Sequence, residues 1–119
     1  MKRTLILGAT PNPTRVAYTA AQHLNKEKHP IALVGIKKGE VAGYKIINDK
    51  RILEGIDTIT LYIGARHQQE WYDYIVATQP KRIIFNPGTE NTELEELARE
   101  NGIHVERACT LVLLSVGLY

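Results

Sequence analysis

The stretch TLILGATPNPTR, residues 4–15, decides the fold. It begins with a short apolar run, Thr4 to Leu7, which is typical of a strand buried on both faces of a parallel sheet. Gly8 ends the run, and from Thr14 onward apolar residues recur at helical spacing as far as Leu24. A strand, a glycine turn and a helix in this order predict the first half of a βαβ unit.

The same alternation continues through the rest of the chain. We predict further strands over residues 31–36, 44–47, 58–63, 82–85 and 103–105, the one over 44–47 being a short edge strand. We predict one helix with Trp71, Tyr72, Ile75 and Val76 on a single face, one that begins with a capping box of Thr92 and Glu95 and ends at Gly102, and a last one over residues 110–118. This order predicts an α/β protein, a Rossmann-like three-layer fold with a parallel sheet flanked by helices on both faces.

Bulk composition indicates one domain over residues 1–119, because 119 residues with 44% hydrophobic content suffice for one core. The net charge of +2 is spread along the chain, which argues against binding to nucleic acid. The single cysteine, Cys109, permits no internal disulfide and favours a cytoplasmic location. No apolar run is long enough for a signal peptide or a membrane span, so we expect no membrane association.

In an open parallel sheet, ligands bind beyond the carboxyl ends of the strands. The loop from Gly8 to Arg15 therefore offers a phosphate site at the start of a helix. Gly8 permits close approach of the backbone, Thr10 and Thr14 supply hydroxyls, and Arg15 supplies a cation. The alternative is a tight turn in which Thr14 caps the helix and Arg15 is solvated. The loop matches neither the dinucleotide fingerprint nor the Walker A pattern.

The end of the second predicted strand carries lysines where an NAD-binding protein has an acidic residue. Lys37 and Lys38 favour a ligand with a phosphate on its ribose, such as CoA or NADP, or else they only keep the loop soluble. The segment NPGTEN, residues 86–91, follows another strand and either approaches a ligand at Gly88 or only leads into the next helix.

The remaining reactive side chains indicate no catalytic centre. His23, His29, His67 and His104 lack the spacing of metal ligands, so we predict no metal site. Cys109 precedes the last helix, where a helix dipole lowers a thiol pKa, but buried packing is the commoner role of such a residue. No Ser-His-Asp or Cys-His arrangement is evident, and we therefore assign no catalytic residue.

Four segments in order give the chain a resemblance to a known family: GATPNPTRVAY, KKGEVAGYKI, NPGTEN and ACT. They resemble the stand-alone CoA-binding domain proteins, which are related to the CoA-binding domain of succinyl-CoA synthetase α subunits. The chain departs from the family pattern at Gly35-Ile36, where the family often has Asn-Pro before the lysine.

The resemblance implies CoA or an acyl-CoA as cofactor, with its pyrophosphate on the first loop and its ribose phosphate or adenine beside Lys37. The predicted cofactor-binding residues are Gly8, Ala9, Thr10, Pro11, Asn12, Thr14, Arg15, Lys37, Lys38, Ile63, Gly64, Asn86, Pro87 and Gly88. The resemblance does not imply the reaction of succinyl-CoA synthetase, whose catalytic histidine lies in a second domain.

Our first hypothesis is therefore non-catalytic binding of CoA or an acyl-CoA. An NADP-linked or other nucleotide-dependent enzyme is the second. A protein-interaction module with a vestigial site is the third, for which the apolar terminus LVLLSVGLY would form a homodimer interface.

Overall fold

The structure is a computed structural model that describes all 119 residues and contains seven strands and four α-helices, with no helix between β2 and β5. The strands are β1 (Thr4–Leu7), β2 (Ile31–Val34), β3 (Glu40–Val41), β4 (Tyr44–Ile47), β5 (Thr58–Leu61), β6 (Arg82–Phe85) and β7 (His104–Arg107). The α-helices are α1 (Val16–Lys26), α2 (Tyr72–Thr78), α3 (Thr92–Glu100) and α4 (Thr110–Ser115). Two single-turn 3₁₀ helices, η1 (Ala65–His67) and η2 (Gln69–Trp71), precede α2.

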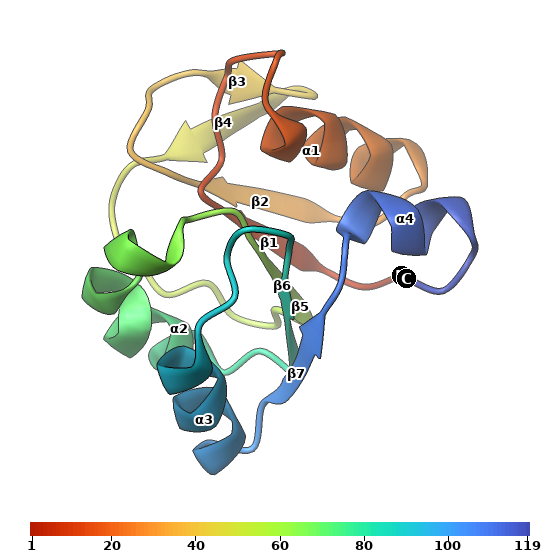
Figure 1. Ribbon diagram of the computed structural model, residues 1–119. Coiled ribbons are helices and arrows are strands. Elements are labelled where there is room, and N and C mark those ends of the chain that lie inside the picture. The colour runs from red at the N-terminus through yellow and green to blue at the C-terminus, as the bar shows by residue number, and fades with distance from the viewer.

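The strands form one sheet in the order β3-β4-β2-β1-β5-β6-β7, parallel throughout except for β3, which pairs antiparallel with β4. Helices α1 and α4 cover one face of this sheet, and α2 and α3 cover the other (Figure 1). The predicted Rossmann-like fold with three layers is therefore confirmed. The strand order reverses at β1, where ligands of such sheets bind.

The core divides into two layers because successive side chains of a strand point to opposite faces. In β1, Leu5 and Leu7 pack toward α2 and α3, whereas Ile6 packs toward α1. All three are fully buried, which explains why this strand is apolar without alternation.

The edge strand was misplaced in the prediction. Residues 44–47 form β4, but β4 lies between β2 and β3, so the edge belongs to the two-residue strand β3. Strand β2 also ends at Val34 rather than Ile36. The Val34 carbonyl accepts the N–H groups of Gly8 and Ala9, which ties the end of this strand to the neighbouring loop.

The predicted helices exist, but their ends and faces differ. The buried residues in and beside α2 include Tyr74 instead of Val76, because the 3₁₀ turns shift the phase of the helix that follows Trp71. Helix α4 ends at Ser115 because Gly117, with φ +72°, begins a left-handed terminating turn.

The cap of α3 is Asn91 and not Thr92. The Asn91 side chain accepts a hydrogen bond from the Leu94 N–H at 3.3 Å, and Glu95 accepts one from the Asn91 N–H at 3.1 Å. The reciprocal capping pair is therefore one residue longer than predicted. Gly102 ends the helix as predicted, with the Ile103 N–H bonded to the Ala98 carbonyl.

None of the helices combines the length with the apolar composition that crossing a membrane requires.

Candidate functional site

A cleft of about 910 Å³ opens beyond the carboxyl ends of the central strands. Its size falls within the range of cofactor pockets. Four segments line it, namely the loops that follow β1, β2, β5 and β6. Since β1, β2 and β5 are the neighbours at the reversal of strand order, the fold alone brings these loops together.

The loop after β1 lies against β5 through a glycine. Gly8 has φ +98°, and a Cβ atom there would lie 2.9 Å from the carbonyl carbon of Tyr62. A side chain would therefore strain the backbone and clash with the next loop. Gly8 therefore allows the first loop to pack directly against the residues that follow β5.

The loops after β1 and β2 touch at two further glycines. A Cβ atom on Gly35 would lie 2.3 Å from the carbonyl oxygen of Ala9, and one on Gly39 would lie 2.6 Å from Cβ of Pro11. Pro11 therefore packs against Gly39, the residue before β3, and does not line the cleft. These contacts give the two loops one fixed relative position.

The amino end of α1 faces the cleft with unpaired donors. Arg15 is the N-cap, and its side chain makes no capping hydrogen bond. The N–H groups of Val16 and Ala17 have no acceptor within the protein, although both residues line the cleft. The first turn of α1 contains no acidic residue. This arrangement of free N–H groups at a helix start suits an anion.

Thr14 does not cap the helix, so that part of the alternative is wrong, whereas Arg15 is exposed to solvent. Its hydroxyl donates to Asn12 Oδ1 at 2.8 Å, and its N–H donates to the same oxygen at 3.0 Å. Asn12 thereby fixes the turn that leads into α1, and both residues line the cleft.

Two cationic side chains line the same end of the cleft, Arg15 and Lys37. Asn48 fixes the turn that carries Lys37, because its amide donates to the carbonyls of Gly35 at 2.8 Å and Lys37 at 2.9 Å. Arg15 and Lys37 are exposed, so each can reach a ligand without first leaving an internal ion pair.

The opposite wall of the cleft, formed by the loops after β5 and β6, carries no lysine or arginine and one carboxylate, that of Glu70; we call it the neutral wall because most of its lining residues are uncharged. Its lining includes Ile63, Gly64, Trp71, Pro87 and Gly88. A Cβ atom on Gly64 or Gly88 would meet nothing within 4 Å, so both glycines face open space. The Gly88 N–H is already bonded to the Glu90 carboxylate at 2.9 Å, which makes this wall a poor seat for an anion.

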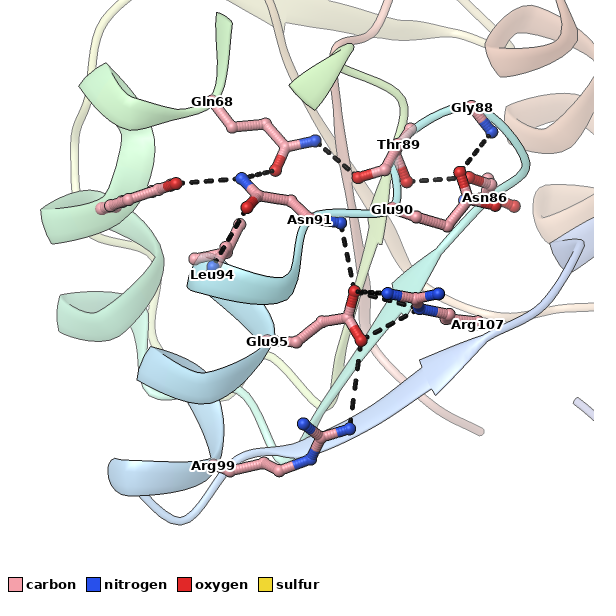
Figure 2. Close-up of polar contacts among 11 residues, drawn as sticks. Gln68, Asn86, Gly88, Thr89, Glu90, Asn91, Leu94, Glu95, Arg99 and Arg107 are labelled. Carbon is pink, nitrogen blue, oxygen red and sulfur yellow. Dashed lines mark hydrogen bonds and ion pairs between the residues drawn. The ribbon is translucent and has the colours of Figure 1, made fainter. Parts of the chain in front are cut away.

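The buried amide side chains of Gln68 and Asn86 organise this neutral wall, and Figure 2 shows the bond from Gln68 to Thr89. The Asn86 side chain donates to Thr60 Oγ1 at 2.8 Å and to the Leu61 carbonyl at 3.0 Å, and it accepts from the Thr110 N–H at 2.9 Å. Asn86 therefore connects β6 to β5 and to α4 from behind the cleft.

Tyr62 is the one cleft-lining residue whose pKa clearly departs from the ordinary value. Burial raises the pKa of its phenol to about 12. Its hydroxyl is buried and lacks a hydrogen-bond partner. Cys109 is the half-buried N-cap of α4 and does not line the cleft.

Most predicted site residues meet in the cleft. All of them line it except Pro11, Lys38 and Asn86. Nine further residues line the cleft and were not predicted from the sequence: Val16, Ala17, Gly35, Ile36, Tyr62, His67, Glu70, Trp71 and Thr89. Val16 and Ala17 could have been predicted, because they are the first residues of the helix whose start was expected to bind a phosphate. His67, Glu70 and Trp71 lie in 3₁₀ turns whose direction no local pattern revealed.

No group of His, Cys, Asp and Glu residues in the structure has an arrangement that could hold a metal ion.

Comparisons with known proteins agree with this geometry. A family model described as a CoA binding domain matches residues 2–115. A crystal structure of an uncharacterized protein is 55% identical and has a TM-score of 0.98, with 100% of this chain and 98% of that chain covered. No similar chain was found among proteins with curated function.

More distant structures share the fold. A protein from Thermus thermophilus has a TM-score of 0.86 at 20% identity, with coverage of 99% of this chain and 90% of that chain. A hypothetical protein from Pyrococcus horikoshii OT3 has a TM-score of 0.80 at 25% identity, with coverage of 98% and 82%. Since the family model spans almost the whole chain, this protein belongs to the CoA-binding domain family.

Proposed function

We propose that residues 1–119 act as one domain that binds CoA or an acyl-CoA in the cleft, without catalysing a reaction. The observation that carries this proposal is the start of α1, where the N–H groups of Val16 and Ala17 are free and Arg15 stands beside them. A diphosphate would accept hydrogen bonds from both N–H groups and pair with the guanidinium of Arg15.

The distribution of charge in the cleft favours one orientation of the cofactor. CoA has a highly charged end, the 3′-phosphorylated ADP, and an uncharged pantetheine arm. Lys37 lies on the cationic side of the cleft, and the neutral wall includes Ile63, Gly64 and Gly88. The 3′-phosphate therefore lies toward Lys37, which the exposed Lys38 follows in the chain, and the pantetheine arm lies along the neutral wall.

Two features support binding without chemistry. The groups that would bind the diphosphate are backbone N–H groups and exposed cations, which hold a ligand by hydrogen bonding and charge. The pKa of Tyr62 moves to about 12, away from the range in which a general acid or base works efficiently.

The test is calorimetric titration with CoA, dephospho-CoA, NADP and NAD, each against the wild type and Lys37→Ala. We expect CoA to bind more tightly than dephospho-CoA, and Lys37→Ala to remove most of that difference. Lys26→Ala, an exposed lysine at the far end of α1, is the matched control and should change neither affinity.

If the protein bound NADP but not CoA, the proposal would be overturned in favour of the NADP-linked enzyme. Binding of none of the four ligands would also overturn it. Acetyl-CoA in a parallel titration separates free CoA from acyl-CoA as the preferred ligand.

A further inference from the structure

Gln68 lies in the short segment between η1 and η2 and is the most completely enclosed amide side chain of the cleft wall. It is 0% exposed, and it does not itself line the cleft. We infer that Gln68 is a positioning residue that sets the neutral wall for the pantetheine arm, an inference that rests on the proposed binding of CoA.

The amide of Gln68 joins two loops that the sheet does not connect. Its Nε2 donates to the Ile63 carbonyl at 2.7 Å and to the Thr89 carbonyl at 2.8 Å. Ile63 follows β5 and Thr89 follows β6, and both residues line the cleft. Figure 2 shows the Gln68 amide directed at the loop that contains Thr89. One side chain therefore fixes the distance between the two parts of the wall.

A second bond extends this connection to α3. The Gln68 Oε1 accepts from Asn91 Nδ2 at 2.8 Å, and the same Nδ2 donates to the Tyr72 hydroxyl oxygen at 2.9 Å. Asn91 is the N-cap of α3, and its N–H is held by Glu95. Glu95 in turn accepts from the Arg107 guanidinium at 2.9 Å (Figure 2). The wall is thus anchored to a helix and an edge strand of the fold.

No other donor replaces Gln68 if it is lost. The carbonyls of Ile63 and Thr89 have no further recorded donor, so an apolar residue at position 68 leaves both without a partner. Buried carbonyls without partners are costly, and the loops relieve that cost by moving apart to reach water. Such a movement widens the neutral wall and leaves the α1 amino end unchanged, because Gln68 makes no hydrogen bond to that end.

Because Gln68 acts on the neutral wall alone, its loss should weaken the binding of the pantetheine arm and not that of the nucleotide, which a purely structural role would not predict. In Gln68→Met, which keeps the side-chain length, we expect CoA to bind about tenfold more weakly. The fragment 3′-phosphoadenosine 5′-diphosphate, which lacks the pantetheine arm, should bind within about twofold of the wild type, because the loss of one hydrogen-bonding side chain is confined to the other wall. Both affinities are measured by calorimetry well below the unfolding midpoint.

Leu24→Ala is the control for general loss of stability. Leu24 is fully buried near the carboxyl end of α1 and does not line the cleft. The Leu24→Ala variant should lower the free energy of unfolding by creating a cavity, and it should leave the affinities for CoA and for the fragment unchanged.

Equal affinity of wild type and Gln68→Met for CoA would overturn the inference, and so would an equal loss for CoA and the fragment. Failure of the wild type to bind CoA would overturn the proposed function instead. In that case hydrogen exchange decides whether Gln68 joins the loops: exchange of residues 63–71 and 86–91 should accelerate in Gln68→Met but not in Leu24→Ala, and unchanged exchange would refute the junction.

Discussion

The two walls of the cleft are held together by different means. On the cationic side, the loops after β1 and β2 meet backbone against backbone at Gly35 and Ala9, and Gly8 packs the first loop against Tyr62 at the end of β5. On the neutral side, the loops after β5 and β6 are joined through the buried amides of Gln68 and Asn86. We therefore expect the cationic wall to be destabilised by added side-chain atoms, and the neutral wall to be destabilised by the loss of a buried hydrogen bond. The following variants test this difference.

The largest effect should come from adding one carbon to the cationic wall. Gly35→Ala places a Cβ atom 2.3 Å from the Ala9 carbonyl oxygen, so the two loops must separate. We expect the free energy of unfolding to fall by about 3 kcal/mol or more, as for a severe overpacking. Urea denaturation measures this loss.

Gly64→Ala is the matched control, because its Cβ atom meets nothing within 4 Å. Its stability should stay within about 0.5 kcal/mol of the wild type. Equal stability of the two alanine variants would contradict the contact between Gly35 and Ala9.

Removing hydrogen bonds from the neutral wall should have the next largest effect. Asn86→Ala deletes the bonds to Thr60, Leu61 and Thr110, and Asn86 is only 2% exposed. We expect a loss of about 2 to 3 kcal/mol, because buried groups lose their partners. Urea denaturation again supplies the measurement.

The exposed Asn101 makes a single bond to the Leu97 carbonyl, and Asn101→Ala should change stability by less than about 0.5 kcal/mol. If Asn86→Ala were equally mild, hydrogen bonding would not be what holds this wall.

A charge change on the cationic wall should affect binding and not folding. Arg15 is exposed and bonded to no acidic side chain, so Arg15→Ala should leave stability nearly unchanged. Its affinity for CoA should fall about tenfold, through loss of one charge-assisted hydrogen bond. Calorimetric titration measures the change.

Arg3→Ala is the control, since Arg3 contacts the Glu54 carbonyl at the other end of the sheet. An affinity of Arg15→Ala equal to that of the control would place the diphosphate elsewhere.

The smallest effect concerns the ionisation of Glu95, which anchors the neutral wall. Burial opposes ionisation of Glu95, but hydrogen bonds from Arg107 and the Asn91 N–H outweigh it and hold the pKa below its ordinary value of 4.5. A carboxyl whose pKa is lowered by folding stabilises the protein above its unfolded pKa, and this contribution is lost as the pH falls through the folded pKa.

Wild-type stability should therefore decline below about pH 4.5, and Glu95→Gln should show a shallower decline. Urea denaturation across this pH range measures both slopes. Identical slopes would mean that Glu95 does not contribute to the acid sensitivity.

The cationic wall was largely predictable, because its determinants are adjacent in sequence. Gly8, Thr14 and Arg15 follow one strand within a few residues, and Lys37 follows the next. A helix start and a strand end are local features, so their positions indicate the ligand site directly. Lys38 was predicted on the same basis but lies outside the cleft lining, because local position does not determine the direction of a side chain.

The neutral wall was predicted only at its backbone positions. Ile63, Gly64, Pro87 and Gly88 were expected from strand ends and from the family resemblance. Gln68 of this wall and Asn48 of the cationic wall were not singled out, because a polar residue in a loop has no periodicity that distinguishes a connecting side chain from a solvated one.

The sequence by itself determined the alternation of strands and helices, the parallel sheet and the loop that offers free N–H groups, since each depends on apolar spacing or on glycine within a few residues. Only the tertiary structure decided that β3 forms the sheet edge, that Asn91 caps α3 and that Gln68 joins two loops. These features depend on distances between segments far apart in the chain. Folding brings such segments together by burying their apolar faces, and the hydrogen bonds between them form only then.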